Sequence, residues 1–357
     1  MNIDWKRWGL ETAQVILTIV VALLMGAVVM QLSGRDALEA YRTLFTSALG
    51  KRTAIADTLL AATPLIFTGL ATAVAFRAGV FNVGVEGSLY MGAFAAAWVG
   101  FTFTGLPGWL LVPLAFTLAG IVGGIWCLVP GYLKARLRVD EIVTTIMLNY
   151  VAILFTSYLV NGPFLVPGLA NAMSEKIAPA AQLARLAPPS QLNLSFVTAL
   201  AAVVVTGFLF RRTTLGYELR TVGANPLFAR WSGMPLGSVI LKVMFLSGLL
   251  GGLAGAGQVL GVHYRFVANF SPGFGFDGIT IALLGRNSPI GTLFAALLFG
   301  VLRSGGSTME LFTDVPRDLI SILEATIIFF VAIEFSLAWL RRRQALPSEE
   351  REAETTP

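Results

Sequence analysis

Long apolar runs alternate with short polar segments along nearly the whole chain. A membrane-spanning helix needs about 20 mostly apolar residues, and ten runs reach or approach that length, two of them short. The pattern therefore predicts an all-α integral membrane protein with about ten transmembrane helices. The predicted helices are residues 13–32, 55–76, 83–103, 109–129, 142–160, 194–210, 239–262, 276–284, 290–302 and 319–340.

The basic residues between these runs predict the orientation of the chain. Cytoplasmic loops of membrane proteins are enriched in Lys and Arg. With the N-terminus inside, alternation of the predicted helices puts every strong basic cluster on the cytoplasmic side and the loop 161–191 outside. We therefore expect both termini in the cytoplasm. The clusters lie at residues 6–7, 134–138, 211–237 and 341–343.

Composition supports this interpretation and excludes several classes of function. The chain is 56% hydrophobic and 13% charged, with a mean hydropathy of +0.76, so charge is too scarce to coat a soluble globule. The net charge of +5 belongs to inter-helix loops and does not indicate nucleic-acid binding. Cys127 and His263 are each the single residue of their type, which argues against a disulfide within the chain, a metal site and a cofactor.

The domain organisation is expected to be simple. Residues 1–342 form one transmembrane domain, with a cytoplasmic loop at 211–237. Residues 343–357 are polar and contain proline, which predicts a disordered tail. The segment 35–52 is predicted as a peripheral helix at the outer surface. No GxxxxGK[ST] motif is present, so the chain is not expected to hydrolyse ATP by that route.

The loop 211–237 contains one short amphipathic helix. Asn225 can cap its first free N–H groups, and Pro226 fits the first helical position. Gly233 and Pro235 end the helix. Helical spacing gathers the apolar side chains Leu227, Phe228 and Trp231 on one face. The pattern alone leaves two roles open: the helix packs on its own bundle, or it is offered to a cleft on a soluble partner.

Two segments interrupt the apolar pattern in the same way. Residues 84–87 and 275–278 both read Gly-x-acid-Gly, and they follow predicted helices of opposite direction. Matching breaks in two halves of a transporter indicate inverted repeats with a site between them. The alternative is that these glycines serve close helix packing, as we expect for the glycine-rich run 248–257.

Ionisable residues at membrane depth usually face a cavity or a partner. Glu86, Asp277 and Glu324 are such residues, and Arg77 and Arg286 flank the two breaks. The acids therefore either pair with these arginines to hold the bundle together or contact a substrate.

A polar stripe on the predicted helix 142–160 raises the same choice. Glu141, Thr145 and Asn149 are spaced i, i+4, i+8 and share one face. They serve either as interhelical hydrogen bonds or as the lining of a pathway.

Four stretches together resemble one known family. They are FRAGVFNVGVEGSLYMGA, GYLKARLRVDEIVTTIMLNYVA, LRTVGANPLFARWSGM and GFGFDGITIALLGRNSPIGTLFAALLFG. They look like the permease subunits of bacterial ABC importers for nucleosides, within the group that includes ribose and branched-chain amino acid permeases. The resemblance covers roughly residues 55–340.

The resemblance implies a location in the bacterial inner membrane, a fold and a set of partners. The fold is a vitamin-B12-permease-like type II importer core of about ten helices. The partners are a second permease subunit, cytoplasmic ABC ATPases and an extracytoplasmic substrate-binding protein. The FRAGVFNVGVEG form and the long N-terminal region look like the larger of two paired permeases, which suggests a heterodimer. The loop matching residues 225–233 is the family's coupling helix, which assigns contact with the ATPase to Asn225, Pro226, Leu227, Phe228, Arg230 and Trp231.

The function expected from these observations is ATP-driven import of nucleosides. Import of simple sugars such as ribose, or of branched-chain amino acids, is the alternative within the family, and an ion-coupled secondary carrier is the alternative from another class. A membrane-embedded enzyme is disfavoured because no nucleophile–base set accompanies the acids. The substrate is expected to pass between the two breaks; the pathway residues are Phe81, Asn82, Glu86, Thr145, Asn149, Phe276 and Asp277.

Overall fold

The computed structural model describes residues 20–32, 34–168, 171–312, 322, 325, 326 and 329. The basic positions 6–7, most of the predicted helix 319–340, and the predicted tail 343–357 lie outside the described residues. The chain divides into two compact units, residues 1–44 with 306–357, and residues 45–305. The candidate site lies within the second unit.

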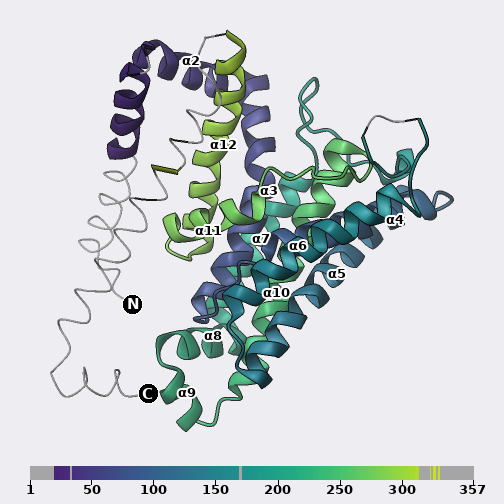
Figure 1. Ribbon diagram of the computed structural model, residues 1–357, viewed down its shortest axis with the longest axis vertical. Coiled ribbons are helices and arrows are strands. Elements are labelled where there is room, and N and C mark those ends of the chain that lie inside the picture. The colour runs from purple at the N-terminus through teal and green to yellow at the C-terminus, as the bar shows by residue number, and fades with distance from the viewer. Residues whose placement is uncertain are drawn as a thin grey trace. The chain divides into compact units, whose positions relative to one another are not determined.

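The described part of the chain is mostly helical (Figure 1). Every predicted run between residues 55 and 302 forms a helix, so the all-α class is confirmed, whereas the number of ten spans stays a prediction. The elements are α2 (Ala37–Leu49), α3 (Arg52–Arg77), α4 (Val85–Thr102), α5 (Gly108–Leu137), α6 (Glu141–Asn161), η1 (Pro179–Ala181), α7 (Ser195–Arg212), α8 (Thr214–Ala224), α9 (Pro226–Trp231), α10 (Leu236–Gln258), the π-helical turn η2 (Val259–His263), α11 (Phe274–Leu284) and α12 (Pro289–Phe312).

The chain is a multi-pass membrane protein. Among the described residues, six helices are long and apolar enough to cross a bilayer: Arg52–Arg77, Gly108–Leu137, Glu141–Asn161, Ser195–Arg212, Leu236–His263 and Pro289–Met309. Val20–Leu32 and Phe274–Leu284 are shorter apolar helices. The structure extends the predicted run 109–129 to Leu137, because the basic last turn with Lys134 and Arg136 continues the helix.

The peripheral helix predicted at 35–52 is helical over Ala37–Leu49, in the smaller unit and at its boundary. Asp36 caps its start, because the carboxylate accepts hydrogen bonds from the N–H groups of Leu38 (2.9 Å) and Glu39 (3.1 Å). Within the same unit, the Tyr41 hydroxyl donates to the Leu23 carbonyl oxygen at 2.7 Å.

A seam of glycines joins the three central helices of the larger unit. On α10, Gly252 packs against the Ala119 carbonyl of α5 and against Gly92 of α4, so closely that a Cβ atom has no room. Gly248 likewise contacts Gly123 of α5. Small residues let helix backbones approach closely in a membrane, so the expectation that the run 248–257 serves packing is confirmed.

Substitution at this seam is expected to destabilise the protein. Gly252→Ala places a methyl group against the Ala119 carbonyl oxygen, and overpacking costs about 1–3 kcal/mol. Gly207→Ala is the matched control, because a Cβ there meets no atom within 4 Å. Thermal unfolding in detergent should show a lower midpoint for Gly252→Ala only. Equal midpoints for both variants would contradict the claim that the helices at the seam are too close for a Cβ atom.

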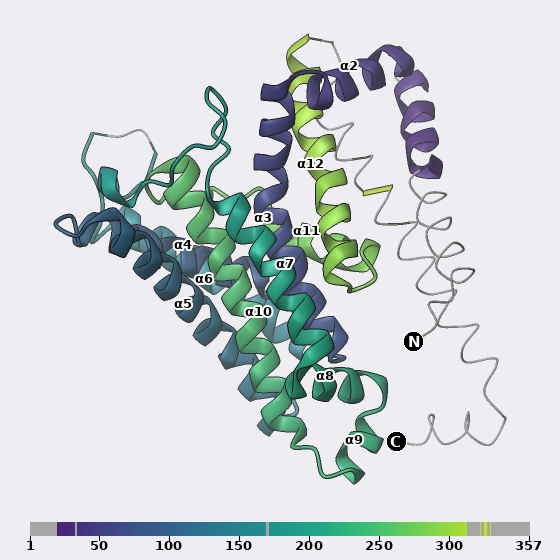
Figure 2. The ribbon, with the colours of Figure 1, turned by 180° about the vertical axis from the view of Figure 1, so that it is seen from behind.

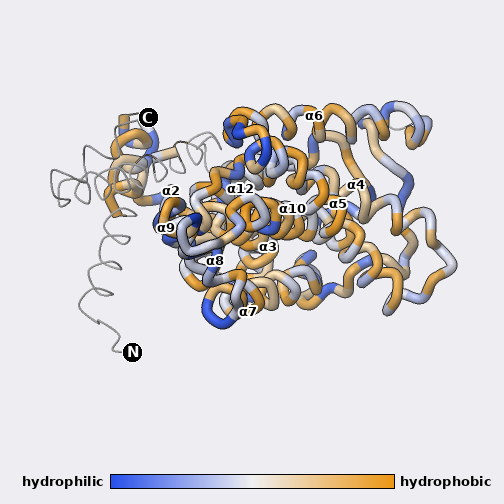
Figure 3. The backbone as a smooth tube through the Cα atoms, turned by 90° about the horizontal axis from the view of Figure 1, so that it is seen from below, coloured by the Kyte–Doolittle hydropathy of each residue, from blue (hydrophilic) through white to orange (hydrophobic). Residues whose placement is uncertain are grey.

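The basic segments gather at one end of the larger unit. Lys134 pairs with Glu141 (2.6 Å) between α5 and α6, Gly223 of α8 packs on the carbonyl of Arg77, and Gly237 lies against Ala135. Figure 3 views α7, α8 and α9 from this end. We call it the basic end.

The loop 161–191 lies at the opposite end. The N–H of Ala178 donates to the carbonyl oxygen of Gly100 near the end of α4 (2.9 Å), and Gly108, which begins α5, packs on Ala180. The separation that the charge pattern predicted, basic loops at one end and the loop 161–191 at the other, is therefore present.

Candidate functional site

The two Gly-x-acid-Gly breaks meet inside the bundle. The Glu86 carboxylate accepts a hydrogen bond from the N–H of Gly275 at 2.5 Å, and the backbones touch there. From this point α4 runs to the end that carries the loop 161–191. In contrast, α11 runs to the basic end, where Asn287 accepts a bond from Arg77. The N-termini of α4 and α11 therefore lie next to each other within the larger unit, whose helices are labelled in Figures 1 and 2.

Acidic and hydroxyl groups satisfy the N-terminus of α11. A helix N-terminus carries a partial positive charge and free N–H groups, and each first turn holds one acid, Glu86 in α4 and Asp277 in α11. The Ser271 hydroxyl oxygen accepts from the N–H groups of Gly273 (3.2 Å) and Phe274 (3.1 Å). The junction is thus held by Glu86 and Ser271.

The ion pair at the second break differs from the prediction. Asp277 pairs with Arg303 of α12, whose guanidinium lies 5.4 Å from the centre of the Phe274 ring. Arg77, one of the two predicted partners of the acids, instead donates to the Asn287 carbonyl oxygen at 3.2 Å and lies over Phe210. Arg303 directly follows the predicted helix 290–302. This charge at the end of an apolar run was the signal that could have identified a partner for Asp277.

Breaking this pair should destabilise the fold. Asp277→Asn removes the negative charge that pairs with Arg303. Both side chains are only 17% exposed, and loss of one charge of a buried ion pair costs about 3–5 kcal/mol. The pair of Glu218 and Lys242 (3.5 Å) is the control, because the Lys242 side chain is 50% exposed and ion pairs open to solvent contribute about 0–1 kcal/mol. Thermal unfolding of Asp277→Asn and Glu218→Gln measures the difference. A charge-swapped double variant of Asp277 and Arg303 that regains nothing would contradict this account.

The stripe on α6 holds the non-helical backbone that precedes α4. Thr145 accepts from the N–H of Val83 (3.3 Å), and Glu141 accepts from the N–H of Phe81 (3.5 Å). Asn149 makes two bonds: it donates to the Val83 carbonyl oxygen (2.9 Å) and accepts from the N–H of Gly87 (2.8 Å). Unpaired backbone groups are costly at membrane depth, so these side chains act as interhelical hydrogen-bonding groups in this structure.

Asn82 ties the same segment to two other helices. Its amide donates to the Ser247 hydroxyl (2.8 Å), which donates to the Ala71 carbonyl oxygen of α3 (2.7 Å). Its own oxygen accepts from the N–H of Gly84 (2.8 Å). Asn82, Thr145 and Asn149 are at most 1% exposed. Ser247 was missed by the sequence analysis, although a hydroxyl inside an apolar run signals a buried hydrogen bond.

Two of the predicted pathway residues present aromatic surface. Phe81 and Phe276 are each 42% exposed. The Phe81 ring packs on Phe76 with ring centres 4.3 Å apart. The predicted set therefore divides into two exposed aromatic rings and a mostly buried polar frame.

The helix predicted in the loop 211–237 is present as α9, Pro226–Trp231, in the lower part of Figure 1. Asn225 caps it, because its side-chain oxygen accepts from the N–H of Phe228 at 2.9 Å. Its large apolar side chains point away from the bundle: Leu227 is 67% exposed and Trp231 is 88% exposed. The preceding helix α8 was not predicted.

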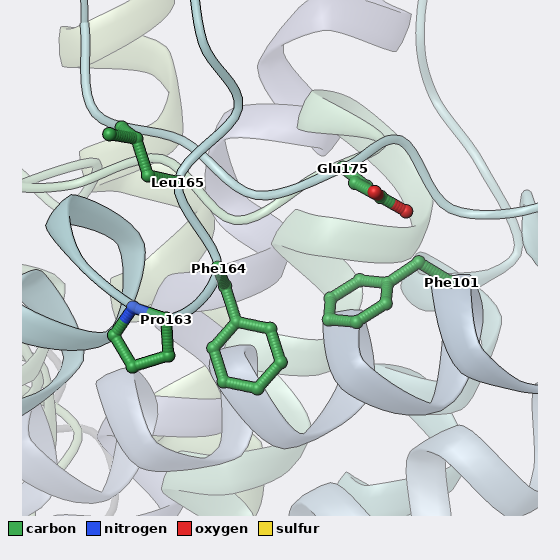
Figure 4. A pocket seen from close by; sticks show the side chains of 5 residues that line it. All are labelled: Phe101, Pro163, Phe164, Leu165 and Glu175. Carbon is green, nitrogen blue, oxygen red and sulfur yellow. The ribbon is translucent and has the colours of Figure 1, made fainter.

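A hollow of about 160 Å³ lies at the opposite end of the larger unit. Figure 4 shows its lining, which includes the rings of Phe101 and Phe164 and the carboxylate of Glu175. None of the predicted pathway residues lines it, so it is separate from the junction of α4 and α11. The lining residues are Phe101, Pro163, Phe164, Leu165 and Glu175.

Comparison with known proteins gives consistent matches over most of the chain. Residues 54–332 match the family described as "Branched-chain amino acid transport system / permease component". The guanosine ABC transporter permease protein NupP of Bacillus subtilis is 37% identical over 334 residues, covering 91% of this chain and 94% of that protein. The nucleoside ABC transporter permease protein NupB of Lactococcus lactis subsp. cremoris is 34% identical over 345 residues, 94% of each. The glucose ABC transporter permease protein TsgB13 of Haloferax volcanii is 38% identical over 338 residues, covering 92% and 87%.

Proposed function

Because the chain belongs to the family of branched-chain amino acid transport system permease components, which are transport subunits and not enzymes, we propose that it is the membrane-spanning permease of an ATP-driven nucleoside importer. The observation that carries the substrate class is the near full-length similarity to NupP and NupB, whose names specify guanosine and nucleosides. The similarity to a glucose permease makes a simple sugar the second candidate.

Uptake into proteoliposomes tests the substrate class directly. The vesicles contain the permease with its ATPase and its binding protein, and they receive labelled guanosine, glucose or leucine. We expect accumulation of guanosine that needs ATP and persists when a protonophore abolishes the proton gradient. Accumulation of glucose alone would favour the sugar permease. Uptake driven by the proton gradient without ATP would favour a secondary carrier.

The proposed assembly contains three kinds of partner. A cytoplasmic ABC ATPase would contact α9, which the exposure of Leu227, Phe228 and Trp231 supports. An extracytoplasmic binding protein would deliver the solute at the other end of the bundle. A second, different permease subunit completes the translocation unit; this rests on the resemblance to the larger member of paired permeases. Purification of a working homodimer with ATPase would contradict the heterodimer.

The proposed pathway runs along the junction of α4 and α11, and the two N-termini support a core of two inverted repeats. A nucleoside has a flat base and several hydroxyl groups and carries no formal charge. Phe81 and Phe276 would offer aromatic faces to the base. Asn82 and Asn149, with the rest of the buried polar frame, would hold in place the backbone that carries these two rings. Such a surface binds weakly enough to release its solute.

Truncating either ring is expected to slow transport. Base–aromatic stacking contributes about 1–3 kcal/mol per base, so Phe81→Ala and Phe276→Ala should each lower uptake about tenfold while thermal stability and basal ATPase activity stay near normal. Phe155→Ala on α6 is the matched control, because this ring is 45% exposed and distant in sequence from both breaks. Wild-type uptake of several nucleosides by both variants would show that the pathway lies elsewhere.

A further inference from the structure

Three arginines gather where α3, α7 and α8 meet at the basic end. The guanidinium of Arg77 lies over the buried Phe210 ring of α7, 4.7 Å from its centre, and Gly223 of α8 packs on the Arg77 carbonyl. Arg211 follows Phe210, and Arg220 precedes Gly223 by about one helical turn. The charges of both arginines act on Arg77. We call Arg77, Arg211 and Arg220 the arginine cluster.

Acidic residues do not neutralise this cluster. Within the described part of the chain, the structure gives none of its three members a carboxylate partner. Glu218 is the acidic residue of the segment 211–237, and it pairs with Lys242 at 3.5 Å. Arg211 and Arg220 are exposed and Arg77 is half-buried. Guanidinium groups in this setting match the oxygens of a phosphate, which they bind through paired N–H groups.

An apolar stripe leads along the exposed side of α7 to Arg211, one member of the cluster. Val197, Val204 and Phe208 are 46%, 71% and 62% exposed, and their spacing, with Val205, continues to Arg211 on the same side of the helix. Membrane-spanning helices place such a stripe against acyl chains and their basic ends at the level of the headgroups. Figure 3 shows the hydrophilic turn that follows α7.

We propose that the arginine cluster and this apolar stripe together form a binding site for an anionic phospholipid. Its phosphate is bound by Arg211 and Arg220, with the positive charge of Arg77 on the buried side of α7 over Phe210, and one acyl chain follows Val204 and Phe208 on the exposed side. The site would join the ends of α3, α7 and α8 next to α9, so an occupying lipid would hold the base of the proposed coupling segment. A soluble anion would use the cluster alone and ignore the stripe.

Lipid titration of the purified full chain, read by native mass spectrometry, tests the proposal. The probes are phosphatidylglycerol, phosphatidylcholine and inorganic phosphate. Each arginine near an anionic surface contributes about a fivefold change in affinity, so the double variant R211Q/R220Q should bind phosphatidylglycerol about 25-fold more weakly. The single variants should each bind phosphatidylglycerol about fivefold more weakly. They test the site if the double variant does not fold.

The matched control removes the same charge elsewhere at the basic end. R136Q/R138Q, at the end of α5, should bind phosphatidylglycerol as the unmodified chain does. Equal losses in both double variants would show a diffuse surface effect and overturn the site. Equal affinity for phosphatidylcholine, or displacement of the lipid by inorganic phosphate at matching concentration, would also overturn it. Unchanged lipid binding with loss of the co-purified ATPase would assign the cluster to a protein partner instead.

Discussion

Trp231→Asp is expected to separate the permease from its ATPase while leaving the fold intact. Trp231 is 88% exposed, so the substitution removes no packing within the chain. If α9 enters a cleft on the ATPase, an unpaired carboxylate is buried there at a cost of about 3–5 kcal/mol. This corresponds to a weakening of at least a hundredfold. The amount of ATPase that co-purifies with the permease, and ATP-driven uptake, measure the effect. Phe228→Asp should act in the same way.

The control for this experiment uses the same position. Trp231→Leu keeps a large apolar side chain and should retain most of the ATPase, and thermal unfolding of both variants should match the unmodified chain. If Trp231→Asp retained ATPase and uptake in full, α9 would have the other role that its spacing allowed, which is packing on its own bundle. The exposure of Leu227 and Trp231 already argues against that packing.

The helices and the capped loop helix were predictable because their signals are local. Apolar runs mark helices whatever they pack against, and the Asn225–Pro226 pair marks the start of α9 because capping involves residues three positions apart. The match between residues 84–87 and 275–278 was also visible, and it placed the candidate site at the junction that the structure shows. The short helix α8 has a mixed pattern with few apolar residues, which explains why it was not predicted.

The partners of the polar residues were not predictable, because each bond joins helices far apart in the chain. The link of Asp277 to Arg303 and the link of Asn82 to Ser247 depend on which helix faces fold together. A single sequence shows that a buried polar group needs a partner and does not show which one. For the same reason the stripe on α6 left open whether its side chains lined a pathway or bonded to backbone.

Asn149→Leu should destabilise the protein strongly. Asn149 both donates to the Val83 carbonyl oxygen and accepts from the N–H of Gly87. Leucine has nearly the same size and makes neither bond, so two buried backbone groups lose their partner at about 1–3 kcal/mol each. We expect a large fall in folded yield and in the thermal midpoint, together with loss of uptake.

Thr156→Val on the same helix is the matched control. Thr156 is 1% exposed, and its hydroxyl bonds to the Ala152 carbonyl oxygen of its own helix, which retains its helical partner without it. Valine keeps the shape of the side chain, so stability and uptake should stay near normal. The result that would refute the structural role of Asn149 is a stable Asn149→Leu protein that has lost uptake. In that case the amide serves the solute directly, and the stripe would line the pathway even though its members are buried in the conformation described here.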